Sequence, residues 1–289
     1  MSEPIERIEH PNNQQTAALT ALIRACNEAD GTGYAYEFYP DYRRPGQADA
    51  FLIREAGVPA AAAVLFAPHS HEVELTAVTL PALRRRGHFS AIVRAVRAEL
   101  AERPARSVLF VNDRRSAAGK AAIAAQGARY EFSEYAMEAT PGDIAPVDGS
   151  TPVGFTLHAA EPAQQQALVE LAQRSFGSDY EASHVELMFA SDTRTPFAVL
   201  CRNTVIGLIG AMEDVDHWSL YSFCVAPEHR GKGYGAAALR GVADHVRTHS
   251  PQKAIKLEVE TQNESALGLY QAVGFSVASA FDYYRLALR

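Results

Sequence analysis

The chain has 289 residues, of which 47% are hydrophobic and 21% are charged, and its formal net charge at pH 7 is −7. This length and composition are typical of a globular protein with two domains, each able to bury its own core. The negative charge argues against a nucleic-acid or anionic-membrane surface, and no apolar run is long enough to span a membrane. The three cysteines, Cys26, Cys201 and Cys224, are far apart, so we expect reduced thiols, a cytoplasmic protein and no metal.

Helices and strands alternate through the first 140 residues. Leu19, Leu22, Ile23 and Cys26 recur at helical spacing and predict a helix over residues 14–29. The next elements are predicted, in order, as strands 50–54, 60–66 and 71–79, helix 89–100, strand 107–111, helix 116–126 and strand 130–137.

A similar order recurs after a segment rich in Pro, Gly and Asp at residues 141–152. The predicted elements are strand 155–158, helix 163–175, strands 197–201, 205–213 and 218–225, and a helix over 233–248. Two arginine–glycine turns, beginning at Arg84 and Arg230, lie 146 residues apart, which indicates a duplicated domain. We therefore predict two α/β domains (α+β mixed sheets with helices on their faces) at residues 1–140 and 153–289, joined by a linker at 141–152.

The turn between the strand at 218–225 and the following helix reads Arg230-Gly231-Lys232-Gly233-Tyr234-Gly235. Glycines let a ligand approach the backbone, and the free N–H groups of a helix start favour an anion. The turn lacks the P-loop pattern. Gly231-x-Gly233-x-x-Ala236 fits the dinucleotide fingerprint loosely, but neither the strands before it nor the acids after it fit that domain.

Two motifs together resemble the GNAT superfamily of N-acetyltransferases. The first is Arg230-x-x-Gly233-x-Gly235, which is similar to that superfamily's acyl-CoA pyrophosphate loop. The second is Leu257-Glu258-Val259-x-x-x-Asn263-x-x-Ala266-x-x-Leu269-Tyr270-x-x-x-Gly274-Phe275. The resemblance implies tandem GNAT-like domains, acetyl-CoA as co-substrate without a metal, and a catalytic second half.

The same resemblance assigns the cofactor-binding residues. It places the CoA pyrophosphate at Arg230, Gly231, Lys232, Gly233, Tyr234 and Gly235, and Asn263 either near the pantetheine or capping its own helix. It also implies that the backbone N–H groups of Phe223, Cys224 and Val225 meet the pantetheine and the thioester oxygen.

Two side chains are candidates for proton transfer. By resemblance, Tyr270 gives its proton to the departing thiolate; alternatively, its ring fills the seam between helix and sheet. Glu258 alternates with Leu257 and Val259, so it faces the other side of the sheet, where partial burial would suit it as the base. Its alternative is a solvated strand carboxylate. Glu213, Asp214, Asp216 and His217 are rival acids and bases that would also suit a polar hairpin.

Cys224 raises the hypothesis of an acyl-enzyme, although a buried cysteine usually only packs.

The first half keeps Arg84-x-x-Gly87 but has Phe89 where the motif has glycine or alanine. Alignment of the motifs places Phe110 opposite Glu258 and Ile123 opposite Tyr270, so this copy is expected to be degenerate. The aromatic stretch from Tyr34 to Tyr42 falls where the superfamily's substrate loop lies; it is either a packed loop or a binding surface.

The sequence thus predicts transfer of an acetyl group from acetyl-CoA to a primary amine of a small molecule or peptide, by direct attack in a ternary complex. The alternative is a non-catalytic acyl-CoA-binding or sensing tandem module. No nucleic-acid or membrane partner is expected, and a homodimer is left open.

Overall fold

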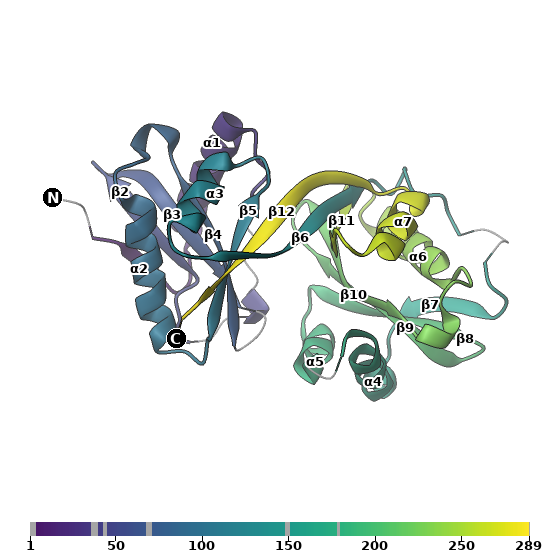
Figure 1. Cartoon of the computed structure of the whole chain (residues 1–289). Coiled ribbons are helices and arrows are strands. Elements are labelled where there is room, and N and C mark those ends of the chain that lie inside the picture. Colours follow the sequence, from purple (N-terminus) through teal and green to yellow (C-terminus); the bar gives the residue numbers. More distant parts are fainter. Residues whose placement is uncertain are drawn as a thin grey trace. The chain divides into compact units, whose positions relative to one another are not determined.

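The computed structural model describes residues 4–35, 40–42, 45–67, 71–147, 151–177 and 180–288. It divides into two compact units (Figure 1). Unit 1 consists of Met1–Glu134 and Ser279–Arg289, and unit 2 consists of Tyr135–Ala278. None of the described helices combines the length and the apolar character needed to cross a bilayer.

Unit 1 is a mixed sheet with helices on both faces. Its strands follow the order β1-β2-β3-β4-β5-β12, in which β4 and β5 are parallel and the other neighbours are antiparallel. The strands are β1 (Glu6–Ile8), β2 (Ala50–Glu55), β3 (Val58–Phe66), β4 (Glu72–Thr79), β5 (Ser107–Asp113) and β12 (Ser276–Ala287). The helices are α1 (Asn13–Asp30), α2 (His88–Ala101) and α3 (Ala117–Ala124), with 3-10 turns η1 (Pro40–Tyr42) and η2 (Pro81–Leu83).

Successive side chains of each strand point to opposite faces, so unit 1 has one core on each side of its sheet. Leu52 and Val78 pack with α1, whereas Phe51 and Phe110 pack with α2 and α3. The two cores fix the strands between two helical layers.

Unit 2 repeats this architecture in the order β6-β11-β10-β9-β8-β7. Its strands are β6 (Arg129–Ala139), β7 (Phe155–Ala159), β8 (Arg194–Cys201), β9 (Thr204–Glu213), β10 (His217–Val225) and β11 (Ala254–Glu260). Its helices are α4 (Gln165–Phe176), α5 (Ala182–Ala190), α6 (Tyr234–His249) and α7 (Glu264–Val273), with 3-10 turns η3 (Pro162–Gln164) and η4 (Pro227–His229). One core lies under α6 and α7 and the other under α4 and α5.

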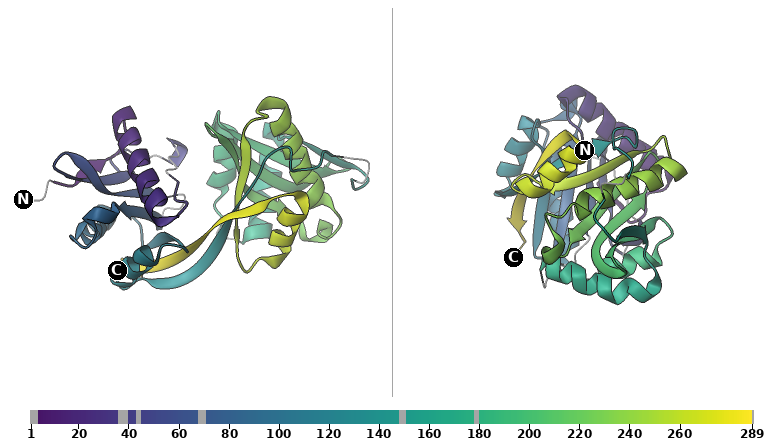
Figure 2. Two further views of the ribbon diagram at one scale, coloured as in Figure 1. Left: turned by 90° about the horizontal axis from the view of Figure 1, so that it is seen from above. Right: turned by 90° about the vertical axis from the view of Figure 1, so that its right-hand side faces the viewer.

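The predicted α/β class with two similar halves is confirmed, but the last strand has a different place from the one expected. β12 pairs with β5 through the register Phe281↔Asp113 to Ala287↔Ser107, so the C-terminal residues complete the sheet of unit 1. Figure 2 shows this strand in yellow, running from α7 to the strands of unit 1. Conversely, residues 135–139 of β6 belong to unit 2. The units are therefore divided within β6, and not at residues 141–152.

The segment predicted as a linker is packed against unit 2 where it is described. Ile144 is only 1% exposed within the core under α6. Arg247 on α6 donates hydrogen bonds to the carbonyl oxygens of Pro141 and Ile144, at 2.5 and 2.7 Å. Residues 148–150 lie outside the described part of the chain.

This exchange of strands predicts that the two sequence halves do not fold separately. A fragment of residues 1–140 lacks β12, which pairs with seven residues of β5, and we expect it to be insoluble or to lack a cooperative melting transition. Co-expression with residues 141–289 should restore a soluble one-to-one complex. Circular dichroism and gel filtration check both outcomes, and a cooperatively folded 1–140 fragment alone would contradict the prediction.

Candidate functional site

Strands β10 and β11 of unit 2 diverge halfway along their length. Their parallel ladder runs from His217↔Ala254 to Leu220↔Leu257 and ends there. Within the described residues, β10 continues to Val225 without a strand partner on its β11 side. The backbone groups along this edge face a gap in the sheet and can bond to a ligand lying between the strands.

A β-bulge lies at the beginning of this gap. The pairing of β10 with β9 passes from Tyr221↔Gly210 to Cys224↔Leu208, so β10 has one residue more than β9. Ser222 within the bulge has φ of +48°, a left-handed conformation that a non-glycine residue rarely adopts. Bulges of this kind are frequent beside active sites, where they redirect a strand.

Two glycines of β9 make room for the bulge. A Cβ atom at Gly207 would lie 2.8 Å from the carbonyl oxygen of Cys224, and one at Gly210 would lie 2.7 Å from the Tyr221 ring. The corresponding strands of unit 1, β3 and β4, pair regularly without a register shift.

The loop after β10 has the backbone expected of an anion site. Gly231 and Gly233 have φ of +69° and +86°, and Gly233 is the N-cap of α6. The Arg230 side chain donates to the carbonyl oxygen of Val225 at 2.8 Å, and Lys232 donates to that of Glu228 at 2.7 Å. Within the described residues neither side chain forms an ion pair, so both charges remain available to an anion beside the helix start.

The loop of unit 1 has nearly the same backbone conformation, but its arginine side chains meet carboxylates. Arg85 and Gly87 have φ of +65° and +88°, close to the values of Gly231 and Gly233. Arg84, however, forms a bidentate ion pair with Asp30, one contact of which measures 3.0 Å. Glu55 accepts from Arg86 at 2.9 Å and lies 2.8 Å from the His88 ring. Carboxylates of unit 1 itself therefore pair with two of the three arginines of this loop.

Two acidic side chains of the hairpin before β10 have charged or titratable partners. Glu213 pairs with Lys253 at 2.8 Å, and Asp216 lies 2.7 Å from the His217 ring. These rival candidates therefore form polar contacts around the hairpin.

Tyr270 is buried beneath the gap, on the α7 side of the sheet. Its side chain is 8% exposed, and its ring centroid lies 6.3 Å from that of Phe223 and 6.0 Å from that of Phe275. Burial raises the pKa of the phenol to about 12, so the hydroxyl keeps its proton near neutral pH. The ring does fill the seam between helix and sheet, and the protonated hydroxyl is in the state that a general acid requires.

Glu258 faces the opposite side of the sheet from Leu257 and Val259, as the alternation predicts. Its side chain is exposed, so the expected partial burial is wrong. The neighbouring Leu257 and Val259 are 5% and 6% exposed and take the core positions. A solvated carboxylate on this face can still accept a proton, directly or through water.

Asn263 begins α7, and the prediction that it caps this helix is confirmed. Its side-chain oxygen accepts the N–H of Ala266 at 3.1 Å. Its side-chain NH₂ group can still donate to a ligand.

Two further predicted residues turn their side chains away from the gap. Tyr234 is 6% exposed, and its hydroxyl donates to the Sγ atom of Cys201 at 3.0 Å, so only its backbone can serve a cofactor. The Cys224 thiol packs with the core under α4 and α5, where burial raises its pKa. A protonated thiol is a poor nucleophile, which argues against an acyl-enzyme on Cys224.

The ladders of the two units correct one predicted alignment. The β4–β5 ladder ends at Leu75↔Phe110, as the β10–β11 ladder ends at Leu220↔Leu257. Phe110 therefore corresponds to Leu257, and Val111 corresponds to Glu258. The prediction of Phe110 opposite Glu258 was shifted by one residue because both segments are apolar.

Two residues of unit 1 that differ from their counterparts in unit 2 are part of the core of unit 1. Ile123 lies in α3 at the predicted equivalent of Tyr270 and is 4% exposed, and the Phe89 ring lies 6.1 Å from that of Phe110. Unit 1 thus has Ile123 and Val111 at the positions that Tyr270 and Glu258 occupy in unit 2. Of the aromatic stretch after α1, Tyr36, Phe38 and Tyr39 lie outside the described residues.

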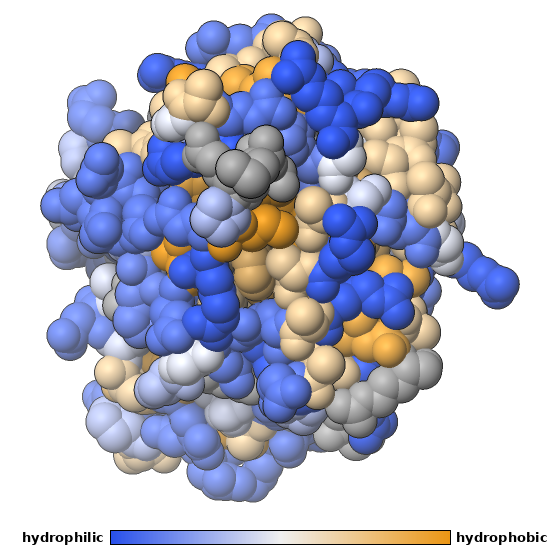
Figure 3. All heavy atoms as spheres, turned by 90° about the vertical axis from the view of Figure 1, so that its left-hand side faces the viewer, coloured by the Kyte–Doolittle hydropathy of each residue, from blue (hydrophilic) through white to orange (hydrophobic). Residues whose placement is uncertain are grey.

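A cavity of about 540 Å³ lies in unit 1, bordered by α2, β2, β1 and residues 45–47. Three of its charged side chains are paired with one another, with Glu99 accepting from Arg7 at 2.6 Å and from Arg103 at 2.7 Å. On the side of the molecule in Figure 3, apolar patches are separated by hydrophilic side chains. These features leave the gap in unit 2 as the stronger candidate.

Sequence reasoning missed Ser222, Gly207 and Tyr180, the last of which donates a hydrogen bond to Ser222 at 2.8 Å. The strand pattern of residues 218–225 gives no signal of a bulge, because the inserted residue is an ordinary serine.

Comparisons with known proteins agree on one family for this region. Residues 165–275 match the model of the Acetyltransferase (GNAT) family. The chain is 28% identical over 284 residues to mycothiol acetyltransferase of Thermomonospora curvata, covering 91% of this chain and 90% of that protein. It is also 35% identical over 71 residues to N-alpha-acetyltransferase RimI of Mycobacterium tuberculosis, covering 24% of this chain and 42% of RimI.

Solved structures show the same fold over almost the whole chain. A GCN5-related N-acetyltransferase from Sphaerobacter thermophilus gives a TM-score of 0.80 at 19% identity, covering 99% of this chain and 96% of that one. A tandem GNAT protein from the clavulanic acid biosynthesis pathway gives 0.73 at 14% identity, covering 99% of both chains.

The environment of Cys224 predicts that its thiol is unreactive. In a variant with Cys26→Ser and Cys201→Ser, a thiol-specific disulfide reagent at pH 8 should label Cys224 at least about a hundredfold more slowly in the folded than in the denatured protein. The reason is that burial both raises the thiol pKa and blocks access. Rapid labelling of the folded protein would restore Cys224 as a candidate nucleophile.

Proposed function

We propose that this chain, which carries a GNAT-family acetyltransferase domain over residues 165–275, is an N-acetyltransferase whose catalytic site lies in unit 2. The reaction is transfer of the acetyl group of acetyl-CoA to a primary amine of a small molecule or peptide, by direct attack in a ternary complex. The observation that carries the proposal is the gap between β10 and β11, which ends at a glycine-rich loop with two cations free of ion pairs among the described residues.

The loop residues suit the diphosphate of CoA. Arg230, Gly231, Lys232 and Gly233 are all exposed, and the first N–H groups of α6, including those of Tyr234 and Gly235, lack intrahelical acceptors. A Cβ atom at Gly233 would contact nothing closer than the Pro152 side chain at 3.5 Å, so the backbone is open to a bulky anion. Asn263 is proposed to add its side-chain NH₂ group beside the pantetheine.

The unpaired edge of β10 suits the pantetheine and the thioester. A ligand lying along this edge can accept from backbone N–H groups of Phe223 and Val225 in place of the missing strand. The Ala226 N–H donates to Ile206 of β9, so by alternation the N–H of Cys224 also faces β9, and that residue borders the ligand without donating to it. A backbone donor aimed at the thioester oxygen would stabilise the negative charge that develops there during attack.

Proton transfer is assigned to two side chains on opposite faces of the sheet. The amine nitrogen attacks the thioester carbon, the C–S bond breaks, and the sulfur leaves as a thiolate that takes the proton of Tyr270. The proton released by the amine passes to Glu258, directly or through water. A phenol of pKa about 12 is a weak acid toward a solvated thiolate, so the transfer requires that the thiolate leave in a site from which water is excluded.

The names of the relatives support this reaction class without choosing the amine. One is named for acetylation of mycothiol and the other for N-alpha-acetylation, so both a small-molecule and a peptide acceptor stay within the proposal.

The alternative function is a binding or sensing module for acyl-CoA without turnover. Such a module needs only the loop and the gap. The retention of Tyr270 and Glu258 in unit 2, while unit 1 carries Ile123 and Val111 in their places, favours the enzyme. Release of free CoA from acetyl-CoA with a panel of primary amines distinguishes the two functions.

The proposal predicts one CoA site per chain, and two matched variants locate it. Gly233→Val should abolish CoA binding in calorimetry, because a branched side chain blocks the approach of the diphosphate. Gly87→Val introduces the same side chain at nearly the same φ in unit 1, so it controls for backbone strain. It should leave the affinity and the one-to-one stoichiometry unchanged. Two equal sites in the native protein, or equal losses in both variants, would contradict the assignment.

The Tyr270→Phe variant distinguishes a role of Tyr270 as general acid from a role in packing alone. The substitution keeps the ring and removes the proton donor, so kcat should fall by about 10²–10⁴-fold while CoA affinity is unchanged. If the hydroxyl has only a packing role, the loss is at most about 1 kcal/mol of stability, and turnover survives.

The raised pKa adds a second test of Tyr270. Because burial moves the phenol pKa upward to about 12, the acid stays protonated through pH 10. The alkaline limb of the kcat profile should therefore not fall at the ordinary tyrosine pKa of about 10. An unchanged single-turnover rate in the Phe variant would remove Tyr270 from the acid role.

A further inference from the structure

The two units carry a tyrosine at the same place, after the first helix of each. Tyr34 follows Gly31, the C-cap of α1, by three residues, and Tyr180 follows Gly177, the C-cap of α4, by three residues. The two tyrosines are thus separated by 146 residues, the same period as the two anion-type loops. Their hydroxyl groups nevertheless bond to different strands.

In unit 1, Tyr34 closes the gap between β4 and β5. Its hydroxyl accepts the backbone N–H of Asp113 at 2.9 Å. The next amide, that of Arg114, donates to Ala280 on the β12 side. Because successive amides of a strand point to opposite sides, the Asp113 N–H points away from β12 and toward β4. The phenol therefore occupies the gap-facing donor of β5, and its ring packs with the α1 core that contains Val78 of β4.

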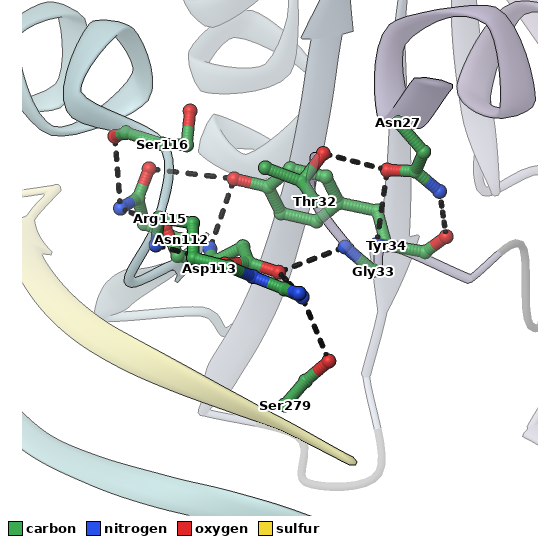
Figure 4. Close-up of polar contacts among 9 residues, drawn as sticks. All are labelled: Asn27, Thr32, Gly33, Tyr34, Asn112, Asp113, Arg115, Ser116 and Ser279. Atoms are coloured by element: carbon green, nitrogen blue, oxygen red, sulfur yellow. Dashed lines mark hydrogen bonds and ion pairs between the residues drawn. The ribbon is translucent and has the colours of Figure 1, made fainter. Parts of the chain in front are cut away.

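Figure 4 shows how firmly this side chain is held. The Asn27 side chain bonds to both backbone groups of Tyr34, donating to its carbonyl oxygen at 2.7 Å and accepting its N–H at 3.1 Å. The fully buried Asp113 carboxylate accepts the N–H of Gly33 at 2.8 Å and pairs with Arg115 at 2.6 Å. Tyr34 is thus fixed from its own backbone and from the end of β5.

In unit 2, the equivalent phenol is held on the other edge of the gap. The Tyr180 hydroxyl donates to the Oγ atom of Ser222 at 2.8 Å, within the bulge of β10. The Tyr180 ring lies between Phe176 and His184, with centroid distances of 5.1 Å to each. The residue it bonds to directly precedes Phe223, where the unpaired edge proposed for the acyl group begins.

We propose that Tyr180 is a positioning residue: by bonding to Ser222, it keeps the gap of unit 2 open and fixes the bulge so that a gap-facing amide of Phe223 or Val225 meets the acyl carbonyl. This inference rests on the proposed function. Tyr34, without a bulge serine to hold it, bonds across the gap and closes the equivalent site in unit 1. The same side chain thus has opposite effects in the two units, depending on one inserted residue in the neighbouring strand.

The test compares ligands with and without the acyl carbonyl. The probes are CoA and its S-acetonyl derivative, a stable ketone that keeps a carbonyl two bonds from the sulfur. The variants are Tyr180→Phe, which keeps the stacked ring, Ser222→Ala, and the double variant, with Tyr34→Phe as the matched control in unit 1. Calorimetry gives both affinities for each protein.

The native protein should bind the ketone about three- to tenfold more tightly than CoA, as one additional hydrogen bond predicts. Tyr180→Phe and Ser222→Ala should each abolish this preference while CoA affinity stays within about twofold, because the diphosphate loop is unaffected. The double variant should lose no more than either single variant, since both remove one interaction. Tyr34→Phe should leave both affinities unchanged and lower the melting temperature by about 2–4 °C.

Three results would overturn the inference. A preference for the ketone that survives in the variants, or additive losses in the double variant, would show that Tyr180 does not act through Ser222. An equal affinity of the native protein for both probes would show that the carbonyl contact is not made, while leaving the proposed CoA site intact. If the native protein binds neither probe, the proposed function fails and the role of Tyr180 fails with it.

Discussion

The candidate site depends on one feature of the sheet of unit 2: the backbone pairing along β10 is interrupted. One inserted residue, Ser222 in a left-handed conformation, shifts the strand by one position relative to β9, and β11 leaves it at Leu220. The backbone groups beyond that point need partners, since an unpaired buried N–H is costly. A ligand that pairs like a strand supplies them. The glycines of β9 serve this arrangement, because a side chain at Gly207 would collide with the displaced strand.

The two units share one loop backbone but differ in the charges around it. Their loops before α2 and α6 have nearly the same dihedral angles, so the peptide geometry of an anion site survives in both. The electrostatics differ. In unit 1 the arginines of the loop meet Asp30 and Glu55, and an incoming anion would compete with carboxylates already in place. A similar loop conformation alone is therefore weak evidence that the loop binds an anion.

The exchange of strands ties unit 1 to unit 2. The last strand of the chain supplies a strand of unit 1, and Asp282 in it accepts hydrogen bonds from Ser133 at 2.7 Å and Arg114 at 3.1 Å. The final strand of the chain finds its pairing partner, β5, in unit 1. Sheet pairing then gives unit 1 a role in folding that does not depend on ligand binding.

Local sequence determined the elements, the loop and the cap. The alternation of β11 placed Leu257 and Glu258 on opposite faces, and Asn263 caps α7 as its position before an apolar helix predicts. These features depend on neighbours within a few residues, which is the range over which sequence patterns act. The bulge at Ser222, the different partners of Tyr34 and Tyr180, the exposure of Glu258 and the place of β12 were decided only by tertiary structure. Each of them depends on which distant strand lies alongside, and a strand's partner is chosen by pairing and packing energies that its own residues do not contain.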